Sequence, residues 1–132
     1  IRGITKTKTT AFFMSDGIDE GNIILQRSLS LNGKIDEIFS RMIENDFKMI
    51  EKIISRNYKL TKQKGKPSIF KRRKPEDSEL KSSSYSLEYY YNFIRMLDDP
   101  YPNAFIKLGN RKLILKNPQF KKGKLFFNGE IL

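Results

Sequence analysis

Apolar residues follow two rhythms in the first half of the chain. Leucines alternate with polar residues across positions 25–31, a two-residue period that predicts a half-buried strand over residues 23–31. The apolar run at residues 9–14 predicts a strand before it. Farther on, apolar residues recur every three or four positions, which predicts a helix over residues 34–56. We expect the whole stripe of this helix to be core: Ile35, Ile38, Phe39, Met42, Ile43, Phe47, Ile50, Ile53 and Ile54.

The second half of the chain predicts a shorter helix followed by strands. A stripe of Tyr90, Phe93, Ile94 and Leu97 predicts a helix over residues 87–97 that ends before the prolines of residues 98–102. Ser86 is its expected N-cap. Two glycine turns then predict two β-hairpins. The first joins residues 104–108 to residues 111–116 through Gly109-Asn110, and the second joins residues 124–127 to residues 130–132 through Asn128-Gly129.

These elements divide the chain into three parts. Residues 1–57 (strand, loop, strand, helix) are typical of the tail of an α/β unit. Residues 58–84 form a basic linker, and residues 85–132 form a small α+β module. A two-stranded ribbon is marginal by itself, and the chain does not begin with methionine. We therefore expect sequence to be missing upstream of Ile1.

Charge and composition narrow the classes of function. The net charge is +11, and residues 58–74 hold eight basic residues without an acid, as residues 107–124 hold seven. Such stretches attract phosphates and polyanions. Cysteine and histidine are absent, which excludes disulfides, a thiolate metal site and a Ser-His-Asp triad within this chain. No apolar run approaches the length of a membrane helix and no signal peptide is present, so we expect a cytoplasmic protein.

The segment Asp16-Gly-Ile-Asp-Glu-Gly-Asn22 stands between the two predicted strands. Glycines allow a sharp turn and close approach to a ligand, and loops at strand ends often carry chemistry. The ordinary interpretation of such a segment is a turn whose Asp side chains bond the local backbone. The rest of the chain favours a functional loop.

Three blocks give the chain its resemblance to a family. They are Asp16-Gly-Ile-Asp-Glu-Gly-Asn-Ile-Ile24, Phe70-Lys-Arg-Arg-Lys-Pro-Glu-Asp-Ser-Glu79 and Ile94-Arg-Met-Leu-Asp-Asp-Pro-Tyr-Pro-Asn-Ala-Phe105. In order and spacing they resemble motifs of the folate-dependent formyltransferases, which include methionyl-tRNA and sugar-nucleotide enzymes. The resemblance implies an α/β fold. It would be the C-terminal part of a formyltransferase-type Rossmann-like domain, followed by a small α+β module.

The same resemblance implies a reaction and a set of residues. Members of the family transfer a formyl group from N10-formyltetrahydrofolate to a primary amine. By position in the motif, Asp19 matches the catalytic carboxylate. Asp16, Gly17, Ile18 and Gly21 match the loop that faces the folate. Glu20 replaces the usual threonine, and the family's asparagine and histidine lie upstream of the matched region, so we expect an incomplete enzyme.

The resemblance leaves more than one amine substrate open. The segment Lys71-Arg72-Arg73 looks more like the sugar-nucleotide members, where these side chains would meet the nucleotide phosphates. We therefore expect a nucleotide-linked amino sugar as substrate, with methionyl-tRNA as the alternative. An alternative of another class is a basic nucleic-acid-binding module in which tyrosines stack on bases. The ordinary role of those tyrosines is helix packing and surface coverage, which we favour because Tyr90 lies on the core stripe. They are Tyr85, Tyr89, Tyr90, Tyr91 and Tyr101.

Overall fold

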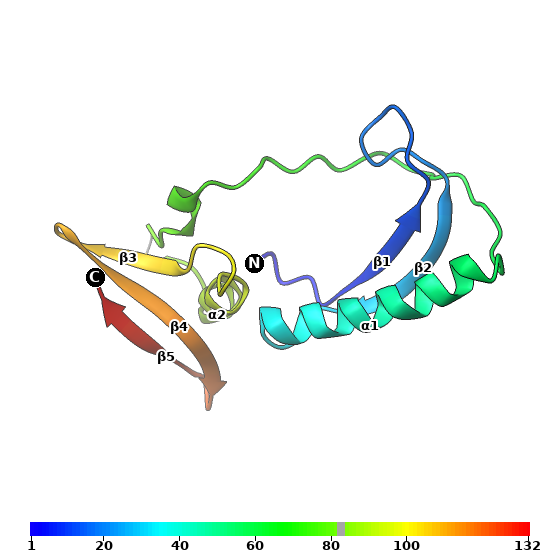
Figure 1. Cartoon of the computed structure of the whole chain (residues 1–132). Coiled ribbons are helices and arrows are strands. Elements are labelled where there is room, and N and C mark those ends of the chain that lie inside the picture. Colours follow the sequence, from blue (N-terminus) through cyan, green and yellow to red (C-terminus); the bar gives the residue numbers. More distant parts are fainter. Residues whose placement is uncertain (82–83) are drawn as a thin grey trace. The chain divides into compact units, whose positions relative to one another are not determined.

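The chain folds into two compact units. A computed structural model describes residues 1–81 and 84–132. The N-terminal unit consists of Thr5–Asn32 and Asp36–Phe70, and the C-terminal unit consists of Ile1–Ile4, Gly33–Ile35 and Lys71–Leu132. The described residues form an α/β fold, as expected, with two antiparallel sheets and two α-helices (Figure 1).

The N-terminal unit is a β-ribbon with one long helix. β1 (Lys6–Phe12) pairs with β2 (Ile23–Ser30), and α1 spans Ile35–Ile54. Acidic residues in the first turn of α1 and Lys52 in the last turn suit the helix dipole. The three elements lie within a few residues of the predicted ranges.

A polar network joins α1 to the ribbon. Asn45 is buried on α1, and its Nδ2 atom donates to Thr9 Oγ1 (3.2 Å) and to the Ser28 carbonyl (3.1 Å). Its Oδ1 atom accepts from Arg27 Nε at 3.0 Å. The amide group of Asn45 is thereby bonded to both strands of the ribbon, which fixes the helix against it.

The expectation that the whole α1 stripe is core is wrong. Ile38 and Met49 are buried, and the sequence interpretation did not include Met49. A second row of the stripe is exposed, because a ribbon of two strands covers only one side of a helix. Its members are Ile43, Phe47, Ile50 and Ile54.

The C-terminal unit packs one helix on a three-stranded meander. α2 (Leu87–Met96) lies against β3 (Ala104–Leu108), β4 (Arg111–Lys121) and β5 (Lys124–Ile131), which pair in that order. Ser86 caps α2 as predicted, its Oγ atom accepting from Tyr89 N at 3.1 Å. The core consists of Phe93, Ile94, Leu97, Ala104 and Leu115.

The second predicted hairpin is wrong. β5 continues through Asn128-Gly129, where Gly129 pairs with Leu115 inside the sheet. The turn lies instead at Lys122-Gly123, whose φ angles of 49° and 70° are those of a two-residue hairpin turn. Glycine at position 129 makes room for a neighbouring side chain within the sheet, because a Cβ there would lie 2.9 Å from a Leu113 methyl group. The turn at Gly109, with a φ of 61°, is where the sequence predicted it.

A bulge interrupts β4 before its final residues. The pairing with β5 shifts register between Lys116 and Gln119, around Asn117 (φ 51°) and Pro118. Proline cannot donate to a sheet ladder, so a bulge is a normal place for it. Among the described residues, no helix has the length and apolar character needed to cross a membrane.

Candidate functional site

The loop between β1 and β2 holds the proposed catalytic aspartate. Phe13 N donates to the Asn22 carbonyl at 3.0 Å, which closes the base of the loop. Gly21 is buried there, and a Cβ on it would lie only 1.5 Å from the Phe13 carbonyl oxygen. Position 21 therefore requires glycine for packing within the loop itself.

Asp19 is held in an uncommon backbone conformation. Its φ angle is 55°, in the left-handed region that aspartate tolerates better than most residues. Gln63 Nε2 donates to the Asp19 carbonyl at 2.6 Å and to the Gly21 carbonyl at 2.8 Å. The backbone of Asp19 is thus fixed while the residue remains exposed.

The sequence pattern did not predict the role of Gln63, which lies in the segment interpreted as a linker. Gln63 lies close to the loop because the nearby Thr61 pairs with Ile23 of β2. The two residues exchange backbone hydrogen bonds of 2.8 and 2.9 Å. An isolated bridge at Thr61 therefore holds residues 61–63 beside the loop. A polar residue between lysines was the only sequence signal for this contact.

The other loop residues divide by exposure. Asp16 is exposed, and Ile18 is 91% exposed. Glu20 folds back over Gly17, so that a Cβ on Gly17 would lie 2.0 Å from a Glu20 carboxylate oxygen. Within the described part of the chain, no group of three or more acidic residues is placed to hold a metal ion.

The expected substrate segment lies in the C-terminal unit. A short 3₁₀ helix, η1 (Pro75–Ser78), follows it. Lys74 N donates to Asp77 Oδ2 at 2.7 Å, and Asp77 N donates to the Lys74 carbonyl at 3.0 Å. The bond from Lys74 N holds the pKa of Asp77 below its ordinary value, with Arg73 adding to the effect.

The three basic residues of this segment differ in what they contact. Arg73 donates through Nη2 to the Asp77 carbonyl, and its guanidinium lies 5.8 Å from the centre of the Phe93 ring. Lys71 and Arg72 are exposed. The structure therefore gives Arg73 contacts within its own unit, whereas Lys71 and Arg72 present their charge to solvent.

The second and third motifs pack against each other. Ser78 is buried, and its Oγ atom donates to the Pro102 carbonyl at 2.9 Å. Leu80 N donates to the Phe105 carbonyl at 2.8 Å. Glu79 forms an ion pair of 3.0 Å with Lys107 on β3. Much of both motifs thus serves to attach the segment before α2 to the edge of the meander.

The arginine of the third motif is also structural. Arg95 is buried on α2, where Nε donates to Asn92 Oδ1 at 2.8 Å and Nη1 donates to the Gly33 carbonyl at 2.6 Å. Burial lowers the pKa of Arg95, and the nearby Tyr91 opposes that shift. Lys34 Nζ donates to Asn117 Oδ1 at 2.8 Å, so residues 33–35 are fixed to this unit twice.

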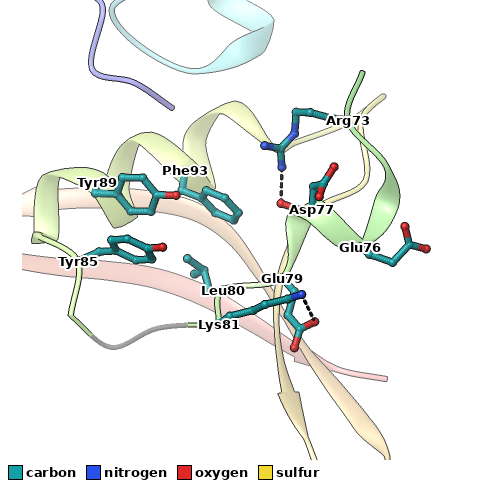
Figure 2. Close-up of a pocket in the computed structure, with 9 residues that line it drawn as sticks. All are labelled: Arg73, Glu76, Asp77, Glu79, Leu80, Lys81, Tyr85, Tyr89 and Phe93. Atoms are coloured by element: carbon teal, nitrogen blue, oxygen red, sulfur yellow. Dashed lines mark hydrogen bonds and ion pairs between the residues drawn. The ribbon is translucent and has the colours of Figure 1, made fainter. Parts of the chain in front are cut away.

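A cavity of about 270 Å³ opens beside Arg73. Figure 2 shows the Tyr85 and Tyr89 rings lying one above the other, and Arg73 bonded to the neighbouring backbone of Asp77. The lining residues are Arg73, Glu76, Asp77, Glu79, Leu80, Lys81, Tyr85, Tyr89 and Phe93.

Comparison with known proteins agrees with the motifs. Residues 75–131 match the family described as "Methionyl-tRNA formyltransferase, C-terminal domain". The solved structure of a methionyl-tRNA formyltransferase from Clostridium thermocellum is 42% identical and superposes with a TM-score of 0.92. That match covers 99% of this chain and 58% of the other, so the chain spans less than two thirds of its relative.

These matches change one expectation and confirm another. Neither supports the amino-sugar substrate, and both favour the alternative, a protein like the methionyl-tRNA formyltransferases. The outcome for the substrate rests on these two similarities, and the phosphate role of Lys71, Arg72 and Arg73 stays a prediction. The resemblance itself is confirmed: over nearly its whole length the chain is similar to the C-terminal portion of a formyltransferase.

Proposed function

We propose that this chain is part of an enzyme that transfers a formyl group to the amino group of methionyl-tRNA. The formyl donor would be N10-formyltetrahydrofolate, which supplies an activated one-carbon unit. The similarity of residues 75–131 to the methionyl-tRNA formyltransferase C-terminal domain carries the proposal. We also propose a cytoplasmic location for this reaction.

The loop from Phe13 to Asn22 is chemically suited to such a donor. The carboxylates of Asp16 and Asp19 are hydrogen-bond acceptors for the N–H groups of a pterin or an amine. Ile18 and Met14 are almost fully exposed and offer apolar contact to a flat ring. We propose that Asp16, Gly17, Ile18 and Gly21 shape this contact, with Gly21 fixed by its approach to Phe13.

Asp19 would act on the amine. An alkyl ammonium must lose a proton before its nitrogen can attack a formyl carbon, and a carboxylate within hydrogen-bond reach can accept that proton. The two hydrogen bonds from Gln63 hold the loop backbone at Asp19 and Gly21, so the carboxylate starts from a defined position. Such positioning lowers the entropy cost of bringing the reacting groups together.

Basic side chains of the C-terminal unit would attract the phosphates of the tRNA. β4, β5 and the turn between them carry Arg111, Lys112, Lys116, Lys121, Lys122 and Lys124. One acid on these strands, Glu130, pairs with Lys116 at 3.3 Å. A positive surface of this kind binds phosphates with a steep dependence on salt.

The test is reconstitution of formyl transfer. The chain would be fused to, or mixed with, the part of the Clostridium thermocellum relative that it does not cover. Transfer of a labelled formyl group to methionyl-tRNA would then be measured. Asp19→Asn should lower kcat by at least a hundredfold, whereas Glu20→Gln, one residue away, should retain most of the activity. Equal activity of both variants, or formylation of an amino-sugar nucleotide instead, contradicts the proposal.

A further inference from the structure

The cavity beside Arg73 combines an aromatic ladder with charged groups of both signs. We propose that it binds a single purine nucleobase, stacked on the ring of Tyr85 with its polar edge against the charged residues that line the cavity. The site lies wholly within the C-terminal unit. It does not depend on the formyl-transfer loop.

The aromatic part of the cavity is already ordered for stacking. The Tyr85 and Tyr89 rings lie 4.2 Å apart at 30°, and the Tyr89 and Phe93 rings lie 5.8 Å apart at 27°. The bond between Ser86 Oγ and Tyr89 N fixes the start of the helix that carries the ladder. Tyr85 ends the ladder and is 46% exposed, so part of its ring is accessible to a ligand. Every nucleobase has a π-face, and stacking on an aromatic ring is a general way to hold one.

The polar part of the cavity suits the edge of a base. Arg73 is oriented by the Asp77 carbonyl and the Phe93 ring, and its guanidinium has five N–H donors. The residues that line the cavity also include Glu76, whose carboxylate is an acceptor. Purine edges carry both acceptors and amino or imino donors, which such a pair can satisfy together.

Other ligands match the cavity less well. Three carboxylates (Glu76, Asp77, Glu79) face two cations (Arg73, Lys81), which disfavours a polyphosphate as the recognised group. Burying a purely aliphatic ligand against these charges would cost free energy without compensating hydrogen bonds. A volume of about 270 Å³ lies below the range of drug-sized pockets and limits the ligand to one nucleoside.

The direct test measures nucleoside binding by the 132-residue chain. Saturation-transfer NMR would be recorded with adenosine, guanosine and uridine. We expect transfer to the purines, with uridine binding more weakly. Tyr85→Ala should weaken purine binding roughly tenfold, whereas Tyr85→Phe, which keeps the ring, should bind within about twofold of the wild type. Tyr101→Ala is the matched control, because Tyr101 is 47% exposed and lies outside the lining.

Several outcomes overturn the proposal. These are no transfer to any nucleoside, uridine binding as well as the purines, or Tyr85→Ala binding like the wild type. Because nucleosides carry no phosphate, their affinity should change little between 50 and 200 mM salt, roughly the span over which phosphate contacts weaken steeply. A steep loss over that range also contradicts base recognition in this cavity.

A second arm distinguishes the source of the base. The chain would be titrated with adenosine monophosphate and with an adenine RNA hexamer. Tighter binding of the hexamer that Tyr85→Ala weakens assigns the cavity to a base within RNA. Equal binding of both ligands, again dependent on Tyr85, assigns it to a free nucleotide. Hexamer binding that Tyr85→Ala leaves unchanged shows that surface lysines alone hold the RNA, and it overturns the proposal.

Discussion

The two helices have similar amphipathic patterns and different surroundings. The apolar stripe of α2 is covered by a meander of three strands, so that Ile94 is only 2% exposed. The stripe of α1 faces a ribbon of two strands, and Ile50 remains 49% exposed. Four large apolar residues form the uncovered row: Ile43, Phe47, Ile50 and Ile54.

This difference shows that an apolar period identifies the residues that would gain from burial, not the structure that buries them. The cover depends on how many strands the same chain contributes. An exposed apolar row of this size is typical of a surface that contacts another part of a protein or a partner. In α2 the apolar stripe is covered by strands of its own unit. Matched substitutions in the two helices can therefore compare a covered stripe with an uncovered one.

The largest effect expected is on the covered helix. Ile94→Ala should lower the free energy of unfolding by about 2–5 kcal/mol, because it leaves a cavity among Phe93, Leu97 and Leu115. Ile50→Ala on α1 removes the same atoms from an exposed site and should cost under about 1 kcal/mol. Urea denaturation followed by far-UV circular dichroism measures both. Equal losses would mean that α1 is covered in solution.

The next comparison concerns glycines within one loop. Gly21→Ala would place a methyl group on the Phe13 carbonyl oxygen, so the closed base of the loop must open, at about 2–3 kcal/mol. Gly17→Ala meets only the end of the Glu20 side chain, which can rotate away. We therefore expect a clear loss of thermal stability for Gly21→Ala and little change for Gly17→Ala. Similar melting temperatures for the two variants would contradict the close approach of Gly21 to Phe13.

Much of the fold could be predicted from sequence because local patterns decide it. Ser86, the proline-ended helix and the turn at Gly109 have local causes, and each lies where the sequence placed it. The predicted hairpin at Asn128-Gly129 was wrong because the turn lies at Lys122-Gly123. That turn allows β5 to pair along Leu113–Lys116 of the longer β4. Choosing between two turns needs the register of the whole sheet, which no local pattern contains.

The candidate site shows the same division. The loop that carries Asp19 could be found because its glycines and acids are contiguous in sequence. Gln63 could not, because it reaches the loop from 42 residues beyond Gly21 through a single bridge at Thr61. Arg73 was assigned to phosphates from the resemblance of its segment and from its charge, and only the structure shows its contacts with Asp77 and Phe93. The roles of Asp19, Lys71, Arg72 and Arg73 remain proposals.

A smaller effect is expected from the polar contact that holds α1 to its ribbon. Asn45→Ala removes the partner of Arg27 and of the Ser28 carbonyl within a partly buried layer, and it should cost about 1–2 kcal/mol. Asn57→Ala, at an exposed position just after α1, is the control and should be near neutral. Amide hydrogen exchange should show faster exchange in α1 for Asn45→Ala and unchanged protection in α2. Faster exchange in both helices would mean that the two units do not respond separately.

The smallest effect concerns charge in the C-terminal unit. The bond from Lys74 N keeps the pKa of Asp77 below its value in the unfolded chain, which is about 3.9. A lowered folded-state pKa contributes stability that is fully present above the unfolded value and is lost as pH falls through the folded one. The stability difference between the wild type and Asp77→Asn should therefore be constant above about pH 5 and shrink below about pH 4. Asp46→Asn on α1 controls for the loss of one negative charge, and urea midpoints measured from pH 3 to pH 7 give the comparison. If the Asp77→Asn difference stays constant across that range, the carboxylate of Asp77 does not stabilise η1 through Lys74.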